Sequence, residues 1–257
     1  MLRVPTIKAH LVVVAPHPDD EVLGCAGSIL QALERGECVT VIYLTRGDAN
    51  RVGVMLDNRT PFPKPKQYTA YGIMREREAN RALDVLGVHP EKRLFLGLPD
   101  MGLQALASPT FQGRYRSPFT KAPSTRQAAL QTLKEALSAG SPAHILVPLP
   151  VDSHSDHRAA ARLVREVLCG LEIEARLSAY PVHSPHWPKP SGSDPSLPLD
   201  PPRYRQQEWQ CIPLTEGQRL LKQQALGQYA SQFRVPLLGK LMRSLVRSNE
   251  LLLPLGS

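Results

Sequence analysis

The chain has 257 residues, a formal net charge of +8 and four cysteines. This length is sufficient for one α/β domain with a full core, and no apolar stretch approaches the ~20 residues that a membrane span needs. The cysteines are scattered without C-x-x-C spacing and no N-terminal signal is visible, which favours a cytoplasmic protein over a disulfide-rich secreted one. The positive charge favours an anionic substrate or surface.

Strand and helix patterns alternate along the chain, which is typical of a mostly parallel sheet covered on both faces. The expected strands lie at 9–15, 38–44, 93–96, 144–148, 176–182 and 207–212. The expected helices lie at 22–35, 71–87, 125–139, 157–169 and 215–229. We therefore predict an α/β fold, a single Rossmann-like three-layer domain over residues 1–257, with a partly irregular C-terminal tail from about residue 235.

Three long connections interrupt this alternation, at residues 46–69, 97–124 and 183–205. Loops of this length in a compact domain are usually functional or disordered. The first two leave the same strand edge, so we expect them to form walls of a substrate pocket. Their specificity cannot be read from the sequence.

The first motif follows the apolar, β-branched run at residues 10–15 and reads His-Pro-Asp-Asp-Glu at residues 17–21. Ligand crevices form at the carboxyl ends of strands in open α/β sheets. Three adjacent acids repel one another unless a cation is present, and imidazole with carboxylates suits zinc. The alternative is a polar turn in which Asp19 or Asp20 caps the next helix.

A second group of polar residues follows the strand at 144–148 and comprises Asp152, His154, Asp156 and His157. Two such groups can meet at one rim of a parallel sheet. Three ligands drawn from them would leave a fourth zinc position for water, as in catalytic sites. The alternative is a pair of solvated loop histidines.

Other histidines are interpreted more simply. His10, His89 and His144 have no acidic neighbours and are expected to be structural. His183 follows a predicted strand, and we favour a loop histidine over a site residue there.

The motifs resemble one known family. The sequence PHPDDEVLGCAGS resembles the AHPDDE signature of the LmbE/PIG-L superfamily of zinc-dependent N-acetylglucosaminyl deacetylases, and HSDHRAA resembles its second motif. Between them, MREREANRALDVLGV is similar to the Arg-x-x-Glu helix of the family and places Arg75 and Glu78 on its positions. The order and spacing agree across roughly residues 10–165, and KQQALGQYASQF is similar to a later family element.

The resemblance implies that His17, Asp20 and His157 hold one zinc ion. Asp19 cannot easily turn to the same ion as Asp20, because adjacent side chains diverge, and in the family this residue is the general base. His154 would stabilise the oxyanion or protonate the leaving amine.

Several roles stay open. Asp156 would hold the His154 imidazole in position or cap the helix. Arg75 resembles a residue that binds sugar hydroxyls, although an ion pair with Glu78 on a solvated helix face is the ordinary alternative. Asp152 stands where some members carry tyrosine, and it could bind substrate or orient His154.

The predicted function is a zinc-dependent hydrolase that removes the N-acetyl group from an N-acetylglucosamine-type sugar or its conjugate and releases acetate. The partner is an N-acetylated amino sugar, anionic or lipid- or nucleotide-linked. The alternative within enzymes is an amidase of another N-acyl sugar conjugate, such as a thiol conjugate. The oligomeric state is not predicted.

Three other classes are disfavoured. A dinucleotide-binding oxidoreductase needs G-x-G-x-x-G after the first strand, where this chain has acids that would repel a pyrophosphate. A nucleic-acid binder needs a basic stripe with interleaved aromatics, which is not evident. A catalytically inactive relative would be expected to lack a ligand, and all three are present.

Overall fold

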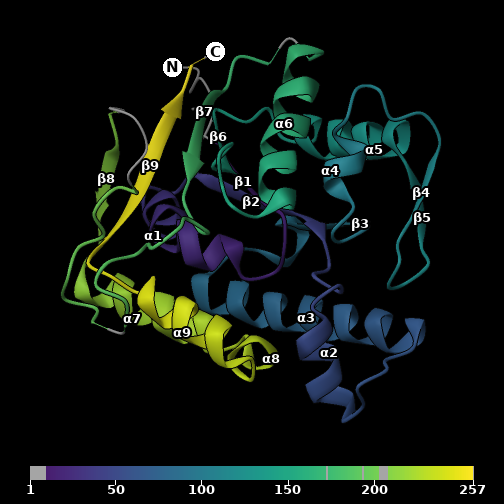
Figure 1. The fold of residues 1–257 in the computed structure, drawn as a ribbon. Coiled ribbons are helices and arrows are strands. Elements are labelled where there is room, and N and C mark those ends of the chain that lie inside the picture. The colour runs from purple at the N-terminus through teal and green to yellow at the C-terminus, as the bar shows by residue number, and fades with distance from the viewer. Residues whose placement is uncertain (1–9, 172, 193, 203–207, 257) are drawn as a thin grey trace.

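The fold is built on one seven-stranded sheet with the order β3-β2-β1-β6-β7-β9-β8 (Figure 1). The structure is a computed structural model and describes residues 10–171, 173–192, 194–202 and 208–256. Pairing is parallel from β3 to β7, whereas β9 runs antiparallel to both of its neighbours. The strands of this sheet are β1 (His10–Ala15), β2 (Cys38–Thr45), β3 (Arg93–Leu98), β6 (His144–Pro148), β7 (Arg176–Tyr180), β8 (Gln210–Pro213) and β9 (Asn249–Leu255).

Helices cover both faces of the sheet, so the predicted three-layer α/β architecture is confirmed (Figure 1). One layer contains α1 (Asp20–Glu34), α3 (Pro65–Leu86), α7 (Glu216–Leu226), α8 (Ala230–Phe233) and α9 (Pro236–Ser244). The other layer contains α4 (Leu103–Leu106), α5 (Arg126–Ser138) and α6 (Ser155–Cys169). Helix α2 (Arg51–Asn58) packs against α3, and a short 3-10 helix, Pro90–Lys92, precedes β3.

The residues of β1 show why the sequence produces two helical layers. All of them are buried. Val13 and Ala15 join the core beneath α1 and α3, whereas Val12 and Val14 join the core beneath α5 and α6. Because successive side chains of a strand point to opposite faces, a strand covered on both faces needs a continuous apolar run.

Two of the connections that were predicted as long loops contain regular structure. The first contains α2, whose N-cap Asn50 accepts a hydrogen bond from Gly53 N at 3.0 Å. The second contains α4 and an antiparallel hairpin of β4 (Arg114–Arg116) and β5 (Pro123–Thr125). Elements this short have no readable hydrophobic period. The predicted strand residues 9 and 207 lie outside the described residues.

The prediction of an irregular tail from about residue 235 is wrong. Helix α9 begins there, and β9 lies between β7 and β8 inside the sheet. The first five residues of β9 are buried. The sequence pattern does not predict this strand, because its apolar residues are leucines rather than β-branched residues and because Pro254 lies within it.

A buried ion pair fixes β9 to α1 and α7. The carboxylate of Glu250 accepts hydrogen bonds from the backbone N–H groups of Gly27 and Ser28, at 2.9 and 3.1 Å, and from Lys222 Nζ at 2.7 Å. Glycine leaves room for the neighbouring side chains here, since a Cβ on Gly27 would lie 3.1 Å from Glu250 Oε2 and 2.1 Å from Leu214 Cδ2. Helix α1 is therefore held in place by a residue far along the chain.

The strand order also positions the site. β1 pairs with β2 on one side and with β6 on the other, all in parallel. The loops after β1 and β6 therefore leave the same edge at a switch point of the topology, where crevices form. Because strands from residue 10 to residue 255 share one sheet, we keep a single domain over residues 1–257 as our proposal.

Candidate active site

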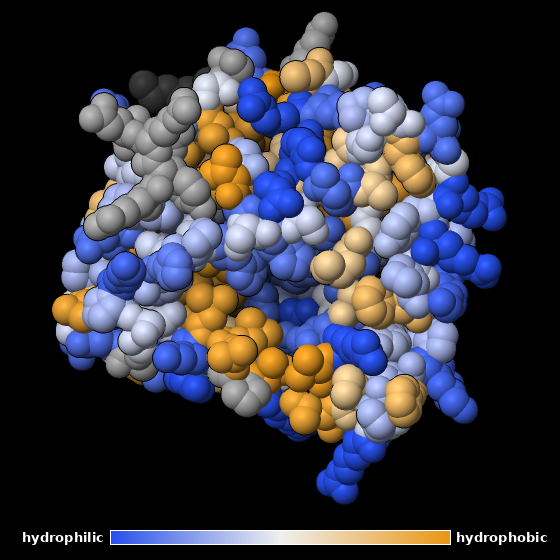
Figure 2. All heavy atoms as spheres, viewed as in Figure 1, coloured by the Kyte–Doolittle hydropathy of each residue, from blue (hydrophilic) through white to orange (hydrophobic). Residues whose placement is uncertain are grey.

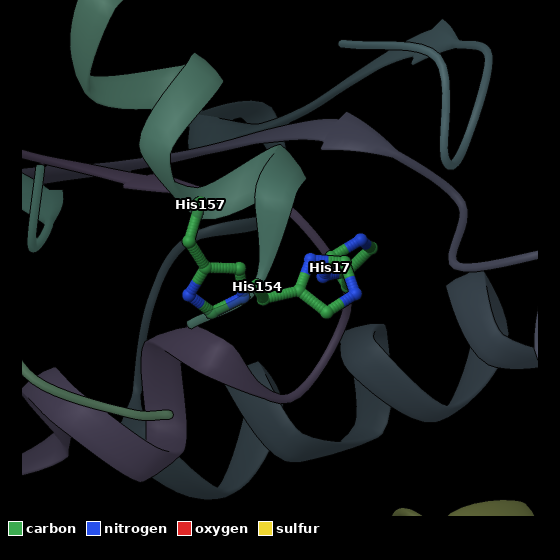
Figure 3. Close-up of side chains that lie close together, drawn as sticks. All are labelled: His17, His154 and His157. Carbon is green, nitrogen blue, oxygen red and sulfur yellow. The ribbon is translucent and has the colours of Figure 1, made fainter. Parts of the chain in front are cut away.

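Two loops bring the predicted histidines together at the carboxyl edge of the sheet (Figure 3). His17 follows β1, while His154 and His157 lie at the start of α6. The ring centroids are 4.8 Å apart for His17 and His154, 5.4 Å for His17 and His157, and 5.1 Å for His154 and His157. Two motifs that are distant in the sequence thus form one cluster, and the alternative of solvated loop histidines is wrong for the buried His157.

Asp20 lies between two of these imidazoles. Its Oδ2 atom is 3.2 Å from His17 Nδ1 and 3.1 Å from His157 Nε2. His157 Nε2 is buried, and its contact with Asp20 Oδ2 is an ion-pair contact rather than an aligned hydrogen bond. Buried polar atoms are rarely left unpaired, and two imidazoles with one carboxylate form a ligand set typical of a zinc site with an open position. These residues therefore fit a divalent ion.

Three overlapping groups of side chains within the described ranges could hold a metal ion. They are His17–His154–His157, Asp20–His157–His183 and His17–Asp100–Asp156. Each group contains at least one of the three predicted ligands, but none of the groups contains all three. We favour the predicted set, because Asp20 Oδ2 approaches both His17 and His157 directly.

A carboxylate stands behind each of the two histidines. His157 Nδ1 is 3.2 Å from Asp152 Oδ2, and His17 Nε2 is 3.2 Å from Asp100 Oδ1. Metal-binding histidines commonly use their second nitrogen in this way, which fixes the tautomer and the ring orientation. Burial lowers the pKa of His157, but Asp20 and Asp152 raise it to about 9. The surrounding negative charge thus favours a cation at this place.

The contacts of Asp152 do not fit the predicted alternative in which it binds substrate. It is buried, and its Oδ1 atom accepts the His154 N–H at 2.7 Å. Its Oδ2 atom accepts the His183 N–H at 3.0 Å and contacts His157. Both oxygens are used inside the protein, so Asp152 orients the turn and the His157 ring.

Sequence reasoning missed Asp100 and undervalued His183. Asp100 comes just after β3 and accepts the Ala49 N–H at 2.6 Å in addition to its contact with His17. His183 follows β7, and its ring centroid is 4.8 Å from that of His157. The signal available was position, because β3 and β7 end at the same edge as β1 and β6.

Asp19 adopts an unusual backbone conformation, with φ at 120°. This region is rarely occupied by residues other than glycine and costs about 1–3 kcal/mol. Two side chains hold it: Glu21 Oε2 accepts the Asp19 N–H at 3.0 Å, and Arg75 Nη2 donates to Asp19 Oδ2 at 2.9 Å and to Pro18 O. Burial raises the pKa of Asp19 to about 7, although Arg75 opposes this shift.

The alternative of an ion pair between Arg75 and Glu78 on a solvated face is wrong. Both side chains are buried, with exposed fractions of 4% and 3%. Arg75 turns towards Asp19 and also donates to Gly47 O at 2.8 Å. Glu78 accepts hydrogen bonds from Ser231 N at 2.9 Å and from Ser231 Oγ at 2.6 Å.

His154, not Asp156, caps α6, because its Nδ1 accepts the Asp156 N–H at 3.3 Å. The proton of a neutral His154 is therefore on Nε2. Burial, with help from the nearby imidazoles, lowers the pKa of His154 to about 3. The Asp156 carboxylate does not hold this ring as predicted: its Oδ2 accepts the Met101 N–H at 2.7 Å and lies 3.7 Å from His17 Nε2.

The site opens into a pocket of about 310 Å³, seen as the blue-lined hollow in Figure 2. This volume suits a small-molecule ligand. Its polar wall is formed by His17, Asp19, Asp20, Asn50, Arg75, Asp100, His154, His183 and Gln232. Its apolar wall is formed by Leu23, Ala49, Val52, Met101, Val235 and Leu238. The predicted pocket wall from the connection 46–69 is thus present in part, through residues 49, 50 and 52.

Several solved structures share the fold, including a deacetylase and a hydratase. The A40926 pseudoaglycone deacetylase Dbv21 is 19% identical, with a TM-score of 0.66, and the match covers 96% of this chain and 97% of that one. The 4-carboxy-2-hydroxymuconate hydratase GalB of Pseudomonas putida KT2440 is 18% identical, with a TM-score of 0.61 and coverage of 91% and 83%. At these identities the likeness concerns the fold alone.

Sequence comparison is more specific. The probable N-acetyl-alpha-D-glucosaminyl L-malate deacetylase 2 of Bacillus anthracis is 25% identical over 225 residues, which are 87% of this chain and 81% of that protein. A profile of the PIG-L family, described as GlcNAc-PI de-N-acetylase, matches residues 12–168. This match spans more than half of the chain and includes both motifs of the site, so the protein belongs to the PIG-L family.

Proposed function

We propose that this protein is a zinc-dependent deacetylase that hydrolyses the acetamide of an N-acetylglucosamine-type sugar or conjugate and releases acetate. The observation that carries the proposal is the arrangement around Asp20, whose Oδ2 approaches both His17 Nδ1 and His157 Nε2. Membership of the PIG-L family supports the amide as the bond attacked. The fold alone does not, because the hydratase GalB shares it.

His17, Asp20 and His157 would hold the zinc ion. When bound, zinc lowers the pKa of a water molecule and polarises the carbonyl of the substrate. The carboxylates of Asp100 and Asp152 keep the two imidazoles oriented, through the contacts at their second nitrogens. They also supply negative charge that offsets the charge of the ion.

Asp19 is our candidate for the general base. It lines the pocket beside Asp20, and Arg75 and Glu21 fix its carboxylate and its backbone. A pKa near 7 suits a group that accepts a proton at neutral pH and later returns it. Arg75, in this proposal, positions Asp19, and it also lines the pocket where it could meet a sugar hydroxyl.

His154 is our candidate for the group that binds the developing oxyanion. Its Nδ1 is occupied by the Asp156 N–H, which leaves Nε2–H as a donor. A neutral imidazole can stabilise a negative oxygen without transferring its proton. The low pKa of His154 favours this role over protonation of the leaving amine.

The substrate class rests on the relatives. The Bacillus anthracis protein is named as a deacetylase of N-acetylglucosaminyl malate, and another solved structure of this fold is an N,N'-diacetylchitobiose deacetylase. We include an anionic or lipid- or nucleotide-linked sugar in the proposal, and we place the reaction in the cytoplasm, which the four free cysteines support. The second candidate is an amidase of another N-acyl sugar conjugate.

A substrate screen tests the proposal. The zinc-loaded protein is incubated with N-acetylglucosamine, N,N'-diacetylchitobiose, N-acetylglucosaminyl malate and an N-acyl thiol conjugate of an amino sugar. Acetate and free amine are measured separately, with and without a chelator. We expect chelator-sensitive acetate release from an acetylated sugar. Amine without acetate would favour the amidase, and no product from any compound would contradict both candidates.

A further inference from the structure

Exposed apolar side chains gather beside the mouth of the pocket. We call the set of Val52 and Leu56 on α2, Phe62 after α2, and Leu237 on α9 the apolar rim. Their exposed fractions are 51%, 49%, 81% and 85%. Figure 2 shows a continuous orange patch over the region of α9, α8 and α2, along the lower border of the hollow. Large exposed apolar patches commonly mark contact surfaces.

The parts of the rim belong to one surface. Helix α8 packs against both α2 and α9. At the end of α8, Arg234 forms an ion pair with Asp57 of α2 at 3.2 Å. Phe62 and Arg51, the first residue of α2, line the same depression in the surface.

Basic residues surround this rim. Six exposed side chains form this basic ring: Arg51, Arg59, Lys64, Lys66, Lys240 and Arg243. In the segments 50–67 and 234–244 the only acidic residue is Asp57, which Arg234 already neutralises. The surface therefore combines apolar side chains with uncompensated positive charge.

We propose that the apolar rim and its basic ring dock onto the surface of an anionic lipid bilayer. Apolar side chains enter the boundary between headgroups and acyl chains, while lysine and arginine pair with anionic headgroups. A second copy of the chain fits this face less well, because two identical basic rings would repel each other. The proposed contact is a peripheral one, made by side chains at the surface. Across the described ranges, no helix is long and apolar enough to span the bilayer.

Docking would place the mouth of the pocket at the lipid surface. Val52 belongs to the rim and also lines the pocket, together with Val235 and Leu238 beside the rim. Molecules held at the membrane would therefore reach the site without crossing a layer of bulk water. The docking itself does not depend on the proposed function, and it is measured without turnover.

Co-sedimentation with vesicles tests the inference. We expect the full-length protein to bind vesicles of equal parts phosphatidylcholine and phosphatidylglycerol, more weakly at high salt, and to bind pure phosphatidylcholine much less. Leu56→Ser with Leu237→Ser should weaken binding about tenfold or more. Lys66→Gln with Lys240→Gln should weaken it on the order of tenfold. Neither pair lines the pocket.

Matched controls keep the inference open to contradiction. Leu220→Ser on α7 removes a leucine about as exposed as Leu56, and Arg165→Gln removes an exposed charge on α6, in the other layer. Both should bind as the unaltered protein does, with unchanged unfolding midpoints. Absence of vesicle binding by the unaltered protein would overturn the proposal. Vesicle binding by the rim variants equal to that of the unaltered protein would also overturn it. A third contrary result would be that the protein does not bind vesicles but forms a dimer, and that Leu237→Ser dissociates this dimer.

Discussion

Strands β1 and β6 have histidines at both of their ends, and the histidines at the amino ends differ from those at the carboxyl ends in their hydrogen bonding. His10 and His144 begin β1 and β6, whereas His17 and His157 follow them. At the amino end, His10 is hydrogen-bonded to Gly140 O at 2.6 Å and to Thr40 Oγ1 at 2.8 Å, so both ring nitrogens are satisfied.

His144 is satisfied in the same way. Its Nε2 is bonded to Ser178 Oγ at 2.9 Å, and its Nδ1 accepts from Arg176 Nη2 at 2.8 Å. Burial and Arg176 lower its pKa to about 4. At the carboxyl end, in contrast, the buried His157 Nε2 faces Asp20 Oδ2 at 3.1 Å without forming an aligned hydrogen bond. A histidine suited to a metal is thus recognised by a nitrogen that faces a carboxylate without an aligned hydrogen bond, and by further carboxylates around the ring, not by burial alone.

The largest difference between the two ends should appear in metal content. We expect His157→Ala to lose the bound ion and all measurable deacetylation, because one of three ligands is removed. His144→Ala, at the amino end of the same strand β6, should keep both the bound ion and the activity. Elemental analysis of the two purified variants makes the measurement. Equal metal content in both would remove His157 from the ligand set.

Asp19 and Asp20 sharpen the contrast within the carboxyl end. Asp19→Asn should keep the metal but lower kcat by about 10²–10⁴-fold, because an amide cannot accept the proton. Asp20→Asn should instead lower the metal content. Parallel assays of rate and bound ion separate the two effects. Near-normal turnover by Asp19→Asn would refute its role as the base.

The carboxylates behind the histidines should have a smaller effect. Asp152→Asn and Asp100→Asn are each expected to weaken metal affinity by about 10–100-fold, because the orientation and basicity of the imidazoles depend on them. Competition with a metal-binding dye measures this change. If Asp152→Asn left metal affinity unchanged but raised KM, our reassignment of Asp152 away from substrate binding would be wrong.

Arg75 should act on the pH dependence. Asp19 accepts a proton only when ionised, so the rate falls as the pH drops through its pKa. Burial raises that pKa, and Arg75 lowers it. Arg75→Gln should therefore move the acidic limb of kcat/KM to higher pH, on the order of one unit. Arg75→Lys, which keeps the charge, should shift it less. A limb that stays in place in both variants would contradict the pairing.

The smallest effect on catalysis should come from changes at the amino ends of β1 and β6. His10→Phe removes two hydrogen bonds and leaves the buried Thr40 hydroxyl and the partly buried Gly140 carbonyl without them, which should lower the free energy of unfolding by about 2 kcal/mol. Metal content and kcat should not change. Denaturant unfolding and elemental analysis test both parts. Loss of metal in this variant would break the distinction between the two ends.

The parts of the site that could be predicted are those encoded locally. His17, Asp19 and Asp20 stand together directly after an apolar strand, and His157 has acidic neighbours in the second motif. Such groups of adjacent acidic residues can be recognised in a sequence, because their charges repel one another and destabilise the fold unless a cation is bound. Asp100 and His183 stand alone in their segments, and only the order of the strands brings them to the same edge.

Orientation was less predictable than position. Asp156 is two residues from His154, so a contact of their side chains was a reasonable expectation. The helix start turns the Asp156 carboxylate towards Met101 instead and offers only its N–H to His154. The fold shows the same limit. The strands with β-branched runs were found, whereas the leucine-rich β9 depends on its neighbours β7 and β8 for its structure.

The anchoring of α1 by Glu250 has a consequence for biosynthesis. The helix that carries Asp20 is made early, but its contact from Glu250 arrives only when β9, which contains Glu250, has been translated. Until then α1 lacks this restraint, and β8 has no partner strand within the sheet, since β9 joins it to β7. A nascent chain arrested before β9 would thus contain both motifs of the site but would lack the contacts from Glu250 that hold α1 in place. Translation of β9, rather than the appearance of the two motifs, would set the moment at which the proposed metal site is restrained enough to bind an ion.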